Sequence, residues 1–176
     1  MKRWIAALAA LLLLVGGCGK LRDQVTDYDA LVKETLAREY AFTGKMTYDG
    51  TQAEAKFTKT GAADITAEFS APEALSGLVV TTAGEEVKVQ FRGMDVDLSA
   101  YTLPTQSALT LLREILTGEK AGKLTVKAEE KQLVASGSIL LTTYEIVFDK
   151  ETMEVQEVRI PSLDGVVEIS DFSFTD

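Results

Sequence analysis

The sequence of 176 residues contains no histidine and no asparagine, and its single cysteine is Cys18. Without histidine, serine–histidine–aspartate and cysteine–histidine catalysis are excluded. Zinc and iron sites that need histidine or several cysteines are excluded for the same reason. Cys18 has no second cysteine in the chain with which to form a disulfide. Only a carboxylate-based enzyme or an oxygen-ligand metal site remains open.

A carboxylate pair lies at Asp95 and Asp97, two residues apart in a predicted strand, where alternate side chains share one face. A calcium ion takes about six to eight oxygen ligands, and no neighbouring residue in the sequence supplies the others. We interpret the pair as a solvated strand face. We therefore expect no metal, no cofactor and no catalytic residue, and the chain is not predicted to be an enzyme.

The chain has no excess of positive charge and only one long apolar run. Its 18 basic and 27 acidic residues give a net charge of −9, which argues against nucleic acid and against a polybasic membrane-docking surface. The apolar run, Ile5–Val15, is shorter than the roughly 20 residues that a transmembrane helix needs. The length suits one domain.

The N-terminal segment has the layout of a secretory signal with a lipid-acceptor cysteine. Lys2 and Arg3 precede the apolar run, and Gly16 and Gly17 separate that run from Cys18. This pattern resembles the lipobox of bacterial lipoproteins. The resemblance implies that Cys18 receives diacylglycerol and that a dedicated peptidase then cuts before it. We expect a signal peptide at 1–17, an acylated cysteine and tether at 18–27, and one domain at 28–176.

Such an anchor would fix the protein to the extracytoplasmic face of the cell membrane, or to the outer membrane if the organism is Gram-negative. One acyl chain binds membranes only marginally, at about 10⁴ M⁻¹, so the two or three chains on such a cysteine make residence stable. Cleavage would leave 16 basic and 27 acidic residues, a net charge of −11. The acidic body is then repelled by anionic lipids while the anchor holds it.

Two segments have the apolar spacing of helices. The first runs from about 28 to 39, with Asp27 or Asp29 as its cap and Leu31, Val32 and Leu36 on one side. The second begins at Pro104 and stops before Gly118, with Ala108, Leu111, Leu112 and Ile115 on one stripe.

The remaining segments alternate with a period of two and are separated by turn residues. They predict eleven sequential antiparallel strands, near 40–49, 51–60, 62–70, 78–82, 85–92, 94–99, 123–128, 131–137, 140–148, 153–160 and 164–174. One face of these strands is apolar and the other polar, which is typical of a sheet that buries one side. The fold class predicted from these patterns is α+β.

The order of these segments resembles the LolA/LolB lipoprotein-carrier superfamily, and more closely small LolA-like lipoproteins of Gram-positive bacteria. The resemblance is carried by these stretches: Phe69–Pro72, Leu78–Thr82, Ala83–Gly84, Glu85–Phe91, Tyr144–Asp149, Met153–Ile160 and Asp164–Phe172. It implies a strongly curved antiparallel half-barrel with helices over an apolar concave side. In several relatives that cavity holds the acyl chains of a lipoprotein or glycolipid.

The alternating pattern supplies candidates for the lining of such a cavity. They are the expected inward-facing residues of the strands and the apolar stripe of the second helix: Phe57, Ile65, Phe69, Val87, Val89, Phe91, Val96, Leu98, Leu112 and Ile115. The alternative is that these side chains pack against one another at native density and leave no void.

The leading hypothesis is therefore a membrane-anchored binding protein that holds an acyl chain or another hydrophobic ligand. Such a protein could take part in lipid or lipoprotein handling in the envelope. The alternative is a non-catalytic accessory or interaction lipoprotein of the cell envelope with a solid core and no ligand. The two differ in whether lipid stays with the purified domain.

Overall fold

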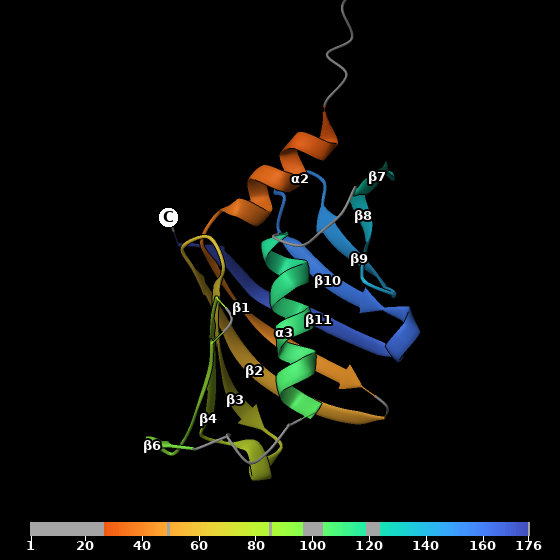
Figure 1. The fold of residues 1–176 in the computed structure, drawn as a ribbon. Helices are drawn as coiled ribbons and strands as arrows, with labels where there is room; N and C mark the ends of the chain where they lie inside the picture. Colours follow the sequence, from red (N-terminus) through yellow and green to blue (C-terminus); the bar gives the residue numbers. More distant parts are fainter. Residues whose placement is uncertain (1–26, 49, 85, 97–103, 119–123, 176) are drawn as a thin grey trace, which may run out of the picture.

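The computed structural model describes residues 27–48, 50–84, 86–96, 104–118 and 124–175. They form one antiparallel sheet with two helices (Figure 1). The helices are α2 (Tyr28–Ala37) and α3 (Pro104–Thr117). The strands are β1 (Tyr40–Tyr48), β2 (Thr51–Thr60), β3 (Asp64–Ala71), β4 (Leu78–Ala83), β5 (Glu86–Phe91), β6 (Met94–Asp95), β7 (Thr125–Ala128), β8 (Gln132–Ile139), β9 (Thr142–Asp149), β10 (Val155–Ile160) and β11 (Gly165–Phe174). The predicted signal peptide, Cys18, the tether before Asp27, and Leu98 lie outside the described residues.

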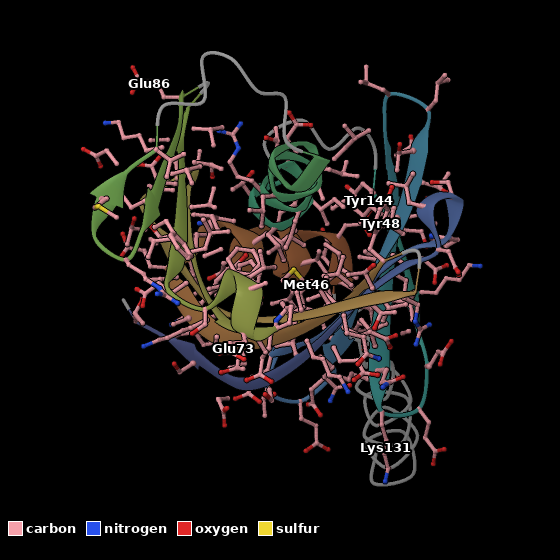
Figure 2. The ribbon with its side chains drawn as sticks, turned by 90° about the horizontal axis from the view of Figure 1, so that it is seen from below. Met46, Tyr48, Glu73, Glu86, Lys131 and Tyr144 are labelled. Atoms are coloured by element: carbon pink, nitrogen blue, oxygen red, sulfur yellow. The ribbon has the colours of Figure 1, made fainter. Side chains whose placement is uncertain are left out.

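The strand order shows how the sheet is assembled from two meanders. It is β6-β5-β4-β3-β2-β1-β11-β10-β9-β8-β7, so the first and the last strand of the chain pair in the middle. The segment that links the two outer strands, β6 and β7, contains α3, and α3 lies across the concave side of the curved sheet (Figures 1 and 2). The predicted α+β class, with a curved antiparallel sheet of eleven strands, is confirmed.

Helix α3 begins at Pro104 and ends at Thr117, as its start and stop residues predict. Its apolar side is centred one residue away from the predicted stripe, because Leu109 is buried and Ala108 is exposed. Arg113 and Glu114 are buried as well, and Arg113 donates a hydrogen bond from Nη1 to the carbonyl oxygen of Gly84. Five successive residues, 112–116, are therefore buried, so this part of α3 is enclosed on its polar as well as its apolar side.

Helix α2 is fixed at both ends by side chains. Asp27 caps its first turn by accepting a hydrogen bond from the backbone N–H of Ala30 at 3.1 Å. At its last turn the ammonium group of Lys59, a residue that is only 1% exposed, donates to the carbonyl oxygens of Ala37 and Arg38 at 3.4 and 2.8 Å. These carbonyls have no partner within the helix, so Lys59 satisfies them and complements the negative end of the helix dipole.

An aromatic cluster fills the centre of the concave side. The rings of Phe42 and Phe57 stack with centroids 4.9 Å apart, and both side chains are buried. This packing requires Gly44 in β1, because a Cβ there would lie 2.8 Å from Cε2 of Phe57. The middle of the half-barrel is therefore solid.

Tyr40 links β1 to the end of α3, because its hydroxyl donates to the carbonyl oxygen of Leu116 at 2.8 Å. Burial raises the pKa of Tyr40 above its ordinary value of 10.0. The unfolded chain therefore loses this proton first as the pH rises, so Tyr40 stabilises the fold fully below pH 10 and progressively less above it.

We expect the free energy of unfolding to fall above pH 10, by about 1.4 kcal/mol per pH unit for this group. Tyr40→Phe should remove that part of the slope and cost about 1 kcal/mol at pH 7 through the lost hydrogen bond. Urea unfolding between pH 7 and 11 measures both. Equal slopes for the two proteins would contradict this role of Tyr40.

The outer strand β6 is shorter than the predicted segment at 94–99. It comprises Met94 and Asp95, which pair with Phe91 and Gln90. Neither described helix is long and apolar enough to span a membrane.

Candidate ligand-binding cavity

Alternate strand connections of an antiparallel sheet lie along the same edge, so this sheet has two rims. The cavity rim carries the connections β1–β2, β3–β4, β5–β6, β8–β9 and β10–β11. Its strand ends are Tyr48 and Thr51, Ala71 and Leu78, Phe91 and Met94, Ile139 and Thr142, and Ile160 and Gly165. The opposite rim carries the connections β2–β3, β4–β5, β7–β8 and β9–β10.

A cavity of about 250 Å³ lies between the sheet and α3 at the cavity rim. In Figure 2, α3 is seen inside the curve of the sheet, and Met46 lies between the two. The lining comes from β1, β2, β3, the short 3₁₀ turn Glu73–Leu75, α3, β10 and β11. It consists of Met46, Thr47, Tyr48, Thr51, Ala53, Phe69, Leu75, Ala108, Leu109, Leu112, Ile160, Gly165, Val166 and Val167.

Small residues explain why a void remains at this end of the sheet and not in its middle. Ala53 pairs with Met46 across β1 and β2, and Gly165 pairs with Tyr48 across β1 and β11. Ala108 lines the cavity from α3. None of the three carries a side chain large enough to fill the space, whereas Phe42 and Phe57 close it a few residues further along the strands.

The lining contains no charged residue, and its side-chain polar groups are the hydroxyls of Thr47, Tyr48 and Thr51. A charged ligand group would lose its hydration there without gaining a partner of opposite charge. Pockets that bind drug-sized ligands usually have volumes of roughly 300–1,000 Å³, so the volume of this cavity lies just below that range. It suits a single neutral, apolar chain.

The predicted cavity residues fall into five groups. Phe69 and Leu112 line the cavity. Phe57, Ile65, Val89 and Ile115 are buried in the hydrophobic core, and Val87 and Phe91 are half-buried on β5. Leu98 lies outside the described residues. Val96 is 39% exposed just beyond the end of β6, although its backbone N–H donates to the carbonyl oxygen of Val89 at 2.9 Å and places it opposite that buried residue, on the same face of the sheet.

Most lining residues were absent from the sequence-based candidates. Those candidates came from β2 to β6 and α3, whereas Met46, Ile160 and Val167 reach the site through β1, β10 and β11. Strands β1 and β11 lie at opposite ends of the domain in sequence, and nothing in their local pattern predicts that they pair. A search for small residues on inward positions near turns would have found Ala53 and Gly165.

A second, polar hollow of about 380 Å³ lies on the opposite rim, lined by Glu129, Glu130, Lys131, Gln132, Asp149 and Gln156. Backbone N–H groups of Thr152 and Glu151 donate to Asp149 and hold its pKa below the usual range, so this carboxylate organises the β9–β10 turn. Within the described ranges, no group of three or more acidic residues is placed to hold a metal.

The sequence matches no protein-family model and no curated protein. Among solved structures, an uncharacterized conserved protein from Thermus thermophilus has a TM-score of 0.53 at 13% identity, over 82% of this chain and 83% of that one. A LolA superfamily protein from Nitrosomonas europaea (TM-score 0.41, 9% identity, 84% and 94% covered) and a putative outer membrane lipoprotein-sorting protein domain from Vibrio parahaemolyticus (0.43, 9%, 84% and 91%) are more distant. At these identities the likeness concerns the fold alone.

Proposed function

We propose that this protein is a membrane-anchored binding protein of the bacterial cell envelope that holds one acyl chain, or a comparable apolar chain, in the cavity beneath α3. The observation that carries the proposal is the cavity itself. Its fourteen lining residues include no charged side chain, although charged residues make up 26% of the sequence. A concave apolar space with a few hydroxyl groups is typical of sites for hydrophobic ligands.

The anchor in this proposal is diacylglycerol on Cys18, supported by the order of cations, apolar run, glycines and cysteine in the sequence. The described domain begins at Asp27. The segment from Gly19 to Asp27 is then a nine-residue tether, which spans at most about 30 Å when extended. The tether thus keeps the domain near the membrane that supplies acyl chains. Holding such a chain is a binding function that requires no catalytic group.

Native mass spectrometry of residues 19–176 tests the proposal. This segment contains every residue of the buried core, which begins at Val32, so it serves as the soluble form. The protein is offered palmitate and, separately, phosphatidylglycerol. We expect a one-to-one adduct with palmitate that survives desolvation. An apo mass alone, together with no change in thermal stability, would reject the binding function and favour an accessory protein with no ligand.

A further inference from the structure

The tip of the β8–β9 hairpin carries two leucines in full contact with solvent. Ile139 pairs with Thr142, so Leu140 and Leu141 are the two central residues of the turn. Their exposed fractions are 97% and 98%, the highest of any large apolar side chain in the described part of the chain. Neither side chain therefore contributes to the core.

The conformation of this turn also disfavours leucine. Leu140 has a positive φ of 55°. Two-residue hairpin turns place glycine, asparagine or aspartate at such positions, because a side chain with a Cβ is strained there. Leu140 thus has a strained backbone and an apolar side chain that folding leaves in water, so the fold gives no reason for its presence. A residue that breaks a local rule in this way is expected at a functional position.

Most of the exposed apolar residues lie at connections along one edge of the sheet. Six large apolar side chains are exposed in the described segments: Tyr48, Met94, Val96, Leu140, Leu141 and Leu163. Five of them lie at the connections of the cavity rim, and Val96 follows two residues after Met94. The turns of the opposite rim instead carry charges such as Glu86 and Lys131, both labelled in Figure 2.

The hairpin itself is electrically neutral over a long stretch. No charged residue occurs from Leu133 to Tyr144, in a chain whose net charge is −9. Other connections of the cavity rim do carry charges, at Glu73, Arg92 and Asp164. The β8–β9 tip is therefore the part of this rim that can leave water without desolvating an ionised group.

We infer that the Leu140–Leu141 tip inserts into the surface of a lipid bilayer and docks the cavity rim against it. A specific protein partner needs roughly 800 Å² of matching surface on each side, which two protruding side chains do not offer. A bilayer requires no matching shape, and the hydroxyls of Ser138, Thr142 and Thr143 suit its hydrated headgroup layer.

This inference goes beyond the proposed function and does not depend on it, because docking requires no ligand in the cavity. If both hold, docking brings the membrane to the edge of the sheet that carries the cavity. The acidic body is repelled by anionic headgroups, so the tip should bind zwitterionic vesicles more strongly than anionic ones. This difference should be largest at low salt, where the repulsion is least screened.

A single tryptophan at the tip tests the inference. Trp4, the one tryptophan of the sequence, precedes Cys18, so residues 19–176 contain none. Leu141→Trp is mixed with phosphatidylcholine vesicles whose acyl chains carry bromine. We expect a blue shift of the emission and quenching by the bromine. Lys131→Trp, on the exposed turn of the opposite rim, is the matched control and should show neither effect.

Three results would overturn the inference: no change at Leu141→Trp, equal changes at both positions, or a shift without vesicles that grows with protein concentration and reports a second copy on the tip. The double variant Leu140→Gly with Leu141→Asn puts glycine at the turn position that has a positive φ, so it should fold at least as well. Its partition into phosphatidylcholine vesicles should fall by at least about tenfold per leucine removed. An unchanged partition would contradict insertion of the tip.

Discussion

Ala53→Phe should block the uptake of an apolar chain and lower the affinity for palmitate at least about tenfold. A loss of about 1.4 kcal/mol in binding free energy already gives that factor. Ala53 is half-buried and lines the cavity opposite Met46. A phenyl ring at this position occupies space that is otherwise empty, so the ligand and the ring exclude each other. Isothermal titration with palmitate, or the adduct fraction in native mass spectra, measures the loss.

Ala62→Phe is the matched control, because Ala62 is exposed in the β2–β3 turn on the opposite rim. It adds the same ring without touching the cavity and should bind palmitate like the wild type. Thermal unfolding checks that both variants are folded, and overpacking at Ala53 should cost no more than about 3 kcal/mol. Full binding by a folded Ala53→Phe protein would place the ligand elsewhere.

Cys18→Ser should prevent incorporation of labelled palmitate and leave the protein at its unprocessed length, because the peptidase implied by the resemblance cuts only after acylation. A serine hydroxyl is not the thiol acceptor that the lipobox resemblance implies. Each buried methylene of an acyl chain contributes about 0.8 kcal/mol to membrane binding, so the variant loses the acyl anchor and keeps only the apolar run Ile5–Val15 of the uncleaved signal peptide. Gel electrophoresis, with the label followed in the same gel, reports both effects.

Gly19→Ser serves as the control because it changes the neighbouring residue and keeps the acceptor thiol. It should remain labelled and membrane-bound. Label on the Cys18→Ser protein would show that another residue is acylated. Unlabelled Cys18→Ser protein at the processed length would show that cleavage does not depend on acylation of Cys18.

Local patterns predicted most of the elements. Alternating apolar residues and turn glycines place the strands within a few residues, and Pro104 and Gly118 bound α3. These signals depend on neighbours in sequence, so they can be read without knowing which strands pair. The length of β6 did not follow from them, because an outer strand has a partner on one side only.

The cavity could not be predicted in the same way. Alternation identifies inward positions such as Phe57 and Phe69, but it does not show which of them are filled by packing. That depends on residues from distant parts of the chain: Phe42 in β1 closes the space beside Phe57, while Gly165 in β11 leaves space beside Tyr48. A void is a property of the assembled sheet, and small residues mark it only once the pairing is known.

Photo-crosslinking with a palmitate analogue that carries a diazirine at the end of its chain tests the central claim most directly. Trypsin releases the peptide Met46–Lys56, which holds five of the lining residues, and the peptide Gly93–Arg113, which holds three more. The account predicts that the label is found on these peptides and disappears in Ala53→Phe. Label confined to the peptide with Leu140 and Leu141, or label unaffected by Ala53→Phe, would contradict a ligand site beneath α3.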